Sequence, residues 1–90
     1  MTERQNTALQ ERMTIIGYFD PAAFEPWIRR HALKLGLSQV ISRRSRNQIE
    51  LLLEGPEELI DMMEMGCSLG PIDAWVDRID RQAIDREMAE

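Results

Sequence analysis

The chain has 90 residues, of which 43 % are hydrophobic, enough for the core of one small domain and too many for a disordered chain. Its net charge of -5 argues against general binding to nucleic acid. No apolar run reaches the length of about 18 residues that a membrane-spanning helix needs, so we expect no membrane association.

The polar N-terminus, MTERQNTALQER, lacks the apolar centre of a signal peptide, and we therefore expect a soluble cytoplasmic protein. Cys67 is the single cysteine, which excludes an internal disulfide and fits a reducing compartment. A lone cysteine and a lone histidine, His31, cannot form a zinc site by themselves. We expect neither a metal nor a cofactor.

The first third of the chain predicts a tail, a strand and a helix. Residues 1–11 are polar and aperiodic, which is typical of a flexible tail. Residues 12–19 are rich in β-branched and aromatic side chains, which favours a strand. Apolar residues then recur at helical spacing over 24–35, so this segment predicts a helix with Pro26 in its first turn and Gly36 at its end.

The middle of the chain predicts a hairpin followed by a second helix. Residues 37–42 and 48–55 favour short strands, and the polar segment SRRSRN between them is typical of a turn. Residues 56–66 begin with a proline and two glutamates, which suit the N-terminus of a helix. We expect Gly66 to end this helix.

The last third predicts one more strand and a tail. Residues 72–79 alternate, with Ile72 and Val76 on one side and Trp75 on the other, which is typical of a half-buried strand. Residues 80–90 are polar with weak helical spacing, and we expect a C-terminal tail that is helical at most in part.

The predicted order is strand, helix, strand, strand, helix, strand, in a domain over residues 12–79. Two split β-α-β units in this order form a ferredoxin-like α+β sandwich, which is a four-stranded antiparallel sheet with both helices on one face. Right-handed crossovers place the first and third strands in the centre of that sheet.

The segment GYFDPAAFE, residues 17–25, joins the first strand to the first helix. A turn that opens a helix is a natural cradle for an anion, because backbone N–H groups point outward and the helix dipole favours negative charge. The small side chains of Ala22 and Ala23 allow a ligand to approach the backbone. The segment therefore predicts a phosphate site.

The sequence resembles the acylphosphatase family, whose loop runs G-x-V-Q-G-V-G-F-R and is followed by A-x-x-L-G-L. The family also has E-G before its second helix and G-P-x-x-A-x-V near its last strand. The matching positions here are Gly17, Phe24, the segment ALKLGL at 32–37, Glu54, Gly55, Gly70, Pro71, Ala74 and Val76. The resemblance covers residues 12–79 and implies the ferredoxin-like fold a second time.

The family hydrolyses acyl phosphates: its loop N–H groups and an arginine bind the phosphate, and an asparagine orients the attacking water. By this resemblance Glu25 stands at the arginine position and Arg43 at the asparagine position. The loop glutamine becomes Asp20, and the loop glycine becomes Pro21, which has no N–H to offer. Because Arg43 only donates hydrogen bonds, it cannot replace an amide. We expect the chemistry to be lost and a Glu25–Arg43 ion pair to fill the site.

Three functions follow from these substitutions. The one we favour is a catalytically inactive acylphosphatase-like protein, a pseudoenzyme that acts as a binding or regulatory module. The second is a working acylphosphatase in which Arg43 or Arg44 supplies the missing positive charge. The third is a sensor of small anions or nucleotides at the 43–46 turn, although a solvated hairpin tip is the simpler and favoured explanation of that turn. The binding positions considered are Asp20, Ala22, Ala23, Phe24, Arg44 and Arg46.

A protein partner is the remaining expectation. Trp75 lies on the polar side of its predicted strand, so it marks a partner surface or is covered by the tail through Ile84 and Met88. An open sheet edge offers a second partner surface. Nucleic acid is not expected as a partner, because the arginine-rich turn lacks interleaved aromatic residues.

Overall fold

The computed structural model describes residues 9–84, which form four strands and two helices. Within this range no helix has both the length and the apolar character needed to cross a membrane. The elements in chain order are β1 (Leu9–Tyr18), α1 (Pro21–Leu35), β2 (Ser38–Arg44), β3 (Gln48–Gly55), α2 (Glu57–Leu69) and β4 (Trp75–Ala83).

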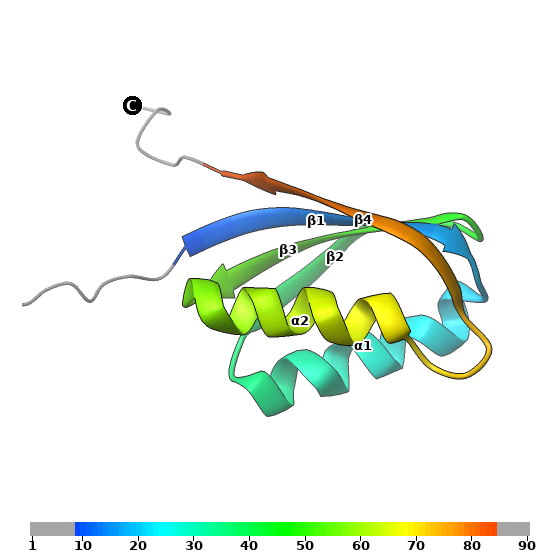
Figure 1. Ribbon diagram of the computed structural model, residues 1–90, viewed down its shortest axis with the longest axis horizontal. Coiled ribbons are helices and arrows are strands. Elements are labelled where there is room, and N and C mark those ends of the chain that lie inside the picture. Colours follow the sequence, from blue (N-terminus) through cyan, green and yellow to red (C-terminus); the bar gives the residue numbers. More distant parts are fainter. Residues whose placement is uncertain (1–8, 85–90) are drawn as a thin grey trace, which may run out of the picture.

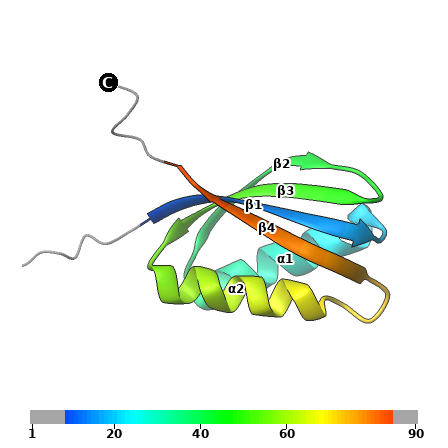
Figure 2. The same cartoon turned by 45° about the horizontal axis from the view of Figure 1, so that its top comes forward.

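The sheet has the order β2-β3-β1-β4, and each neighbouring pair is antiparallel. Both helices cover one face of the sheet, and the opposite face is open (Figures 1 and 2). The predicted ferredoxin-like sandwich is therefore confirmed, with the first and third strands in its centre. The physical reason is the right-handed crossover, which carries each helix back over the same side of the sheet.

The core lies between the sheet and the two helices. Alternate residues of β1 and β3 are buried against the helices, as the two-residue period of a strand requires. Helix α1 contributes residues four apart, and α2 contributes residues at spacings of three and four. The buried hydrophobic residues are Met13, Ile15, Phe19, Phe24, Ile28, Ala32, Leu37, Ile49, Leu51, Leu53, Ile60, Met63 and Cys67.

Helix α1 begins three residues earlier than its apolar pattern indicates. Asp20 is the N-cap and Pro21 the first helical residue, so Pro26 lies inside the helix rather than in its first turn. The predicted start of the helix was wrong because the first three residues, Pro21, Ala22 and Ala23, are not buried in the core, so the apolar pattern begins only at Phe24. Gly36 ends the helix at φ 77°, as predicted, because this left-handed conformation favours glycine.

Helix α2 continues past Gly66 to Leu69 and ends at Gly70, which has φ 64°. The prediction of Gly66 as the helix end was therefore wrong. Gly66 is needed for close packing instead: a Cβ there would lie 2.9 Å from Cδ2 and 3.0 Å from Cε1 of His31 in α1. The His31 ring is itself stacked on Trp27, with ring centroids 4.9 Å apart.

We expect Gly66→Ala to lower the free energy of unfolding by about 1 kcal/mol, because crowding against His31 outweighs the better helix propensity of alanine. Urea denaturation measures the change. In a His31→Ala background the same substitution is expected to stabilise the protein by about 0.5 kcal/mol, since only the propensity gain remains. Destabilisation of equal size in both backgrounds contradicts this explanation.

The sheet is longer than predicted at the end where β1 begins and β4 ends. Strand β1 begins at Leu9 rather than at residue 12, and β4 extends to Ala83, so residues 80–83 belong to the sheet and not to a tail. The polar sequence of β4 reflects its edge position, where most side chains face solvent. Ile72, placed in this strand by its alternation, precedes it and is 98 % exposed.

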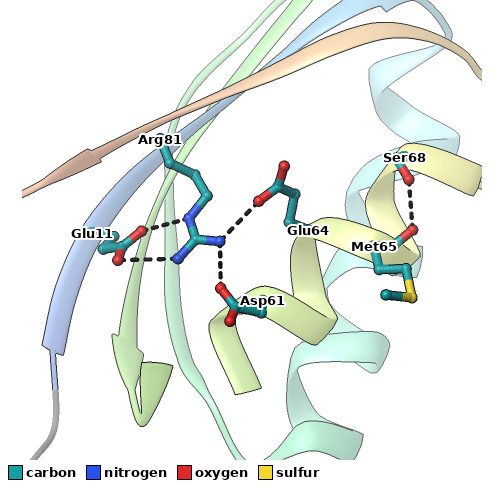
Figure 3. Close-up of polar contacts among 6 residues, drawn as sticks. All are labelled: Glu11, Asp61, Glu64, Met65, Ser68 and Arg81. Atoms are coloured by element: carbon teal, nitrogen blue, oxygen red, sulfur yellow. Dashed lines mark hydrogen bonds and ion pairs between the residues drawn. The ribbon is translucent and has the colours of Figure 1, made fainter. Parts of the chain in front are cut away.

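The end of β4 is attached to the rest of the molecule by Arg81 (Figure 3). Its guanidinium donates to both carboxylate oxygens of Glu11 in β1, at 2.7 and 3.1 Å. It also donates to Asp61 at 2.7 Å and to Glu64 at 2.8 Å, both in α2. The hydrogen bond with Glu11 is the main cause that raises the pKa of Arg81 above its ordinary value, so the charge persists at every ordinary pH. Arg81 thus connects β4 to β1 and to α2.

Candidate functional site

The turn between β1 and α1 is closed by hydrogen bonds within the chain. The side chain of Asp20 accepts from the N–H of Ala22 at 3.0 Å. The backbone carbonyl oxygen of Asp20 accepts from the N–H groups of Ala23 and Phe24, at 3.1 and 2.9 Å. Pro21, the first helical residue, has no N–H. The first N–H groups of a helix are those that normally remain free for an anion. Here the carboxylate of Asp20 takes the place that the sequence predicts for a phosphate.

The end of β1 is bound in the same way by the hairpin turn between β2 and β3. The N–H of Gly17 donates to the carbonyl of Asn47 at 3.2 Å, and that of Phe19 donates to the carbonyl of Arg46 at 2.9 Å. Two further N–H groups of the loop are therefore directed at protein carbonyls. The loop keeps its position through these contacts and does not need a bound ligand to do so.

Glu25 lies one turn into α1 and is held by two arginines. Its Oε2 accepts from Arg29 at 2.6 Å and from Arg44 at 3.3 Å. The side chain of Glu25 is 13 % exposed, so solvent screens this carboxylate less than a surface one. The cluster of one carboxylate and two guanidinium groups keeps one excess positive charge.

The prediction of an ion pair between Glu25 and Arg43 is wrong, because Arg43 pairs with Glu50 and Arg44 pairs with Glu25. A bulge in β2 explains the difference. The register of β2 against β3 shifts just before Arg43, which then lies opposite Glu50 on the open face of the sheet. Arg44 comes to lie opposite the buried Ile49, on the helix side. An extra residue in a strand reverses the alternation of side chains beyond it. Arg44 therefore takes the partner that unbroken alternation assigns to Arg43.

A shallow hollow of about 320 Å³ lies beside the β1–α1 turn. It is lined by Tyr18, Phe19, Asp20, Arg46 and Asp73. Asp73 comes from the loop between α2 and β4 and belongs to none of the predicted binding positions. Its signal was weak, because a single acidic residue in an alternating segment is most simply explained as a solvent-facing strand position. The hollow holds two carboxylates and one guanidinium, a poor charge balance for a phosphate dianion.

The other predicted binding residues do not converge on one ligand. Phe24 is buried in the core and packs edge-to-face on Phe19 at 5.1 Å between ring centroids, so its side chain is structural. Ala22 and Ala23 are exposed, but their N–H groups are bound to Asp20. The arginines of the 43–46 turn point to three separate partners: Arg43 to Glu50, Arg44 to Glu25, and Arg46 to the hollow.

The remaining residues that can carry chemistry are structural here. Burial raises the pKa of the Cys67 thiol to about 12, and the charge of Glu64 adds to this effect, so the thiol stays protonated at neutral pH. His31 packs between Trp27 and Gly66, as described above. Residues 9–84 contain no group of three or more His, Cys, Asp or Glu side chains placed to hold a metal ion.

Comparison with known proteins decides the family. A family model described as Acylphosphatase matches residues 12–90. The chain belongs to the acylphosphatase family. A relative named acylphosphatase from Azorhizobium caulinodans is 29 % identical over 80 residues, which cover 89 % of this chain and 80 % of that protein. An acylphosphatase from Nitrobacter hamburgensis is also 29 % identical, over 81 % of this chain and 74 % of its own length.

Solved structures support the acylphosphatase fold. An acylphosphatase from Coxiella burnetii matches with a TM-score of 0.82 at 22 % identity, over 94 % of this chain and 90 % of that one. Full-length HypF, solved in a phosphate- and nucleotide-bound form, matches with a TM-score of 0.75 at 19 % identity, over 87 % of this chain and 10 % of HypF. At these identities the likeness concerns the fold, and the site of this chain has to be judged by its own residues.

Proposed function

We propose that this acylphosphatase-family protein does not hydrolyse acyl phosphates and acts as a binding or regulatory module. The closed β1–α1 turn carries the proposal. Asp20 supplies an internal anion to the N-terminus of α1, and Pro21 offers no N–H there. A phosphate dianion entering this turn has to displace that carboxylate or lie beside it, and at about 4 Å each pair of unit charges costs roughly 1 kcal/mol in water.

Glu25 supports the same conclusion from the position where the family has an arginine. Instead of a guanidinium that contacts the phosphate, this position holds a carboxylate, and that carboxylate already binds Arg29 and Arg44. Bidentate contacts between a guanidinium and a phosphate are among the strongest that such a site makes. Here the donors of both arginines are partly used within the protein, so a bound phosphate loses this contribution.

A second candidate function is hydrolysis in which Arg44 supplies the positive charge. Two observations favour it: the bulge in β2 directs Arg44 to the helix side of the sheet, and the side chain of Arg44 is 57 % exposed. The one excess positive charge at Glu25, Arg29 and Arg44 attracts an anion. The names of the two relatives agree with this candidate.

Hydrolysis of benzoyl phosphate by the purified protein separates the two candidates. We expect a rate equal to that of the buffer, and no change on Arg44→Gln. The matched control is Arg43→Gln, which removes the same charge from the neighbouring residue, whose side chain lies on the open face of the sheet. Our proposal is contradicted if the protein hydrolyses benzoyl phosphate faster than the buffer does, and if Arg44→Gln abolishes this activity while Arg43→Gln leaves it unchanged. That result establishes the second function.

The open face of the sheet is where we propose that a protein partner binds. Tyr18 and Trp75 lie directly opposite each other in the β1–β4 pairing and are 68 % and 69 % exposed. Tyrosine and tryptophan dominate the binding energy of many interfaces. Ile84 does not cover Trp75, because it follows the far end of β4 and donates to the carbonyl of Gln10. Met88 lies outside the described residues.

A further inference from the structure

Strand β4 forms one edge of the sheet, beside β1, in the described part of the chain (Figure 2). The N–H of Ile84, directly after β4, donates to the carbonyl of Gln10 in β1. Hydrogen-bonding direction alternates along an antiparallel strand, so residues 78, 80 and 82 also direct their N–H and C=O groups toward β1. Residues 79, 81 and 83 therefore direct theirs outward. Such a row of outward groups is a template on which a strand of another chain can pair.

The charges in the middle of β4 are complementary to those of a second, antiparallel copy of the strand. Residues 77–81 read Asp-Arg-Ile-Asp-Arg. If Ile79 lies opposite Ile79 of the second copy, Arg78 lies opposite Asp80 of that copy, and the same pair occurs a second time by symmetry. The side chains of Arg78 and Asp80 are more than half exposed and share the open face of the sheet, because they are two residues apart in a strand. The two copies thus bring together four charges in alternating order.

The register centred on Ile79 is the one in which these charges attract. Opposing side chains of paired strands lie on the same face, so the centre of a symmetric pairing falls on a residue. Within residues 77–81 every other centre, at 77, 78, 80 or 81, places a charged residue opposite its own counterpart. Like charges directly opposite each other destabilise a strand pair. The centre at Ile79 avoids such pairs, and there Asp77 lies opposite Arg81 of the second copy.

We propose that two copies of this chain associate through β4 and form one sheet to which each copy contributes its four strands. The two-fold axis passes between the facing Ile79 residues, perpendicular to the sheet, so every contact occurs twice. The outward N–H and C=O groups of Ile79 exchange hydrogen bonds with those of its counterpart. Arg78 and Asp80 then occupy the intervening positions, at which opposing side chains approach most closely. Both helix layers lie on one side of the extended sheet, and both open faces lie on the other.

The surroundings of the edge determine the strength of this contact. On the helix side, Asp61 and Glu64 of α2 are both bound by Arg81, which reduces the repulsion of these acids across the two-fold axis. The register of β4 against β1 shifts between Ile16 and Gly17, so the regular part of β4 that can pair is short. A contact of this length buries less than the standard of about 800 Å² per partner, and we expect a weak dimer with a Kd on the order of 10–100 μM.

The other edge of the sheet lacks this complementarity. Strand β2 carries Arg43 and Arg44 and no acidic residue, so no register of two β2 strands brings opposite charges together. A pairing of β4 with β2 of another copy leaves a free edge at each end and continues from copy to copy. The pairing of two β4 edges closes at two copies, and the charge pattern therefore favours a dimer.

Sedimentation velocity of the full chain over a range of concentrations, at near-physiological salt, tests the inference. We expect a monomer–dimer equilibrium for the wild type. Arg78→Asp places two carboxylates opposite each other in both halves of the interface, and Asp80→Arg does the same with two guanidinium groups. Each substitution is expected to raise the Kd at least about tenfold, because two attractive pairs become repulsive.

The exchange of the two charges within one chain is the decisive variant. Arg78→Asp combined with Asp80→Arg keeps the composition, and opposite charges again face each other in both halves, so we expect the Kd of the wild type. For the same reason an equimolar mixture of the two single variants is expected to associate more tightly than either alone. The matched control, Arg43→Asp, changes the charge equally at the β2 edge and is expected to dimerise like the wild type. Circular dichroism verifies that each variant is folded.

A wild-type protein that stays monomeric up to about 1 mM overturns the inference, since this concentration exceeds the expected Kd at least about tenfold. A folded single variant that associates as tightly as the wild type overturns it as well, and so does a folded exchange variant that fails to associate. The inference does not rest on the proposed function, because neither Arg78 nor Asp80 lines the β1–α1 hollow. The outcome of the benzoyl phosphate assay therefore leaves this test unaffected.

Discussion

Replacing Arg81 by methionine is expected to lower the free energy of unfolding by about 3 kcal/mol. The substitution keeps most of the apolar stem but leaves Glu11, which is only 8 % exposed, without its bidentate partner. Asp61 and Glu64 lose the same cation, and the three carboxylates then repel one another. Urea denaturation followed by circular dichroism measures the loss.

Arg78→Met is the matched control on the same strand. Among residues 9–84 Arg78 pairs only with Asp80, at 3.3 Å, and both side chains are more than half exposed, so its removal is expected to cost at most about 0.5 kcal/mol. Glu11→Gln in the Arg81→Met background is expected to recover part of the loss, because no buried charge remains without a partner. Equal effects of the Arg81 and Arg78 substitutions contradict the role of Arg81 in attaching β4.

Replacing Gly17 by alanine is expected to lower the free energy of unfolding by about 3 kcal/mol or more. A Cβ at this position overlaps the carbonyl oxygen of Trp75 and lies 2.9 Å from Cα of Val76 and 3.0 Å from the carbonyl carbon of Trp75. These are backbone atoms of the paired strand β4, at the point where its register shifts. They cannot move away without separating β4 from β1.

Gly36→Ala is the comparison that separates crowding from backbone conformation. Gly36 has a left-handed φ of 77°, but within the described part of the chain no atom lies within 4 Å of a Cβ placed there. Its replacement is therefore expected to cost only the conformational term, about 1 kcal/mol. Urea denaturation of both variants tests the order of the two effects. A Gly17 variant as stable as the Gly36 variant shows that the β1–β4 contact yields more easily than the structure indicates.

The sequence predicts the architecture well because local patterns and global topology agree in this chain. The alternation in β1 and β3, the helical spacing in α1 and the stop at Gly36 each follow from short segments. The family resemblance rests on glycines and prolines at turns, whose backbone requirements are local. Where a segment is polar on both faces, as β4 is at the sheet edge, its pattern carries little information, and residues 80–83 resemble a tail.

The location of the candidate site stays a prediction from the sequence, whereas the contacts of Glu25 differ from the predicted ones. The substitutions at Glu25 and Asp20 are visible in the sequence, and so is the loss of the N–H at Pro21. That Asp20 caps α1 follows from its residue type and position, because aspartate is a preferred N-cap. The partner of Glu25 was assigned to Arg43 because the family resemblance places these two residues at the arginine and asparagine positions of the site, and the resemblance does not reveal the bulge in β2.

By itself the sequence determined the family, the order of the elements and the charge reversal in the loop, because these depend on residue types and on spacings within single segments. Only the tertiary structure decided that Arg44 meets Glu25 and that Arg81 joins β4 to β1 and α2. It also decided that Gly66 accommodates His31. Each of these contacts joins residues that are distant in the chain. Their formation depends on register, a bulge and helix packing, which no local pattern specifies.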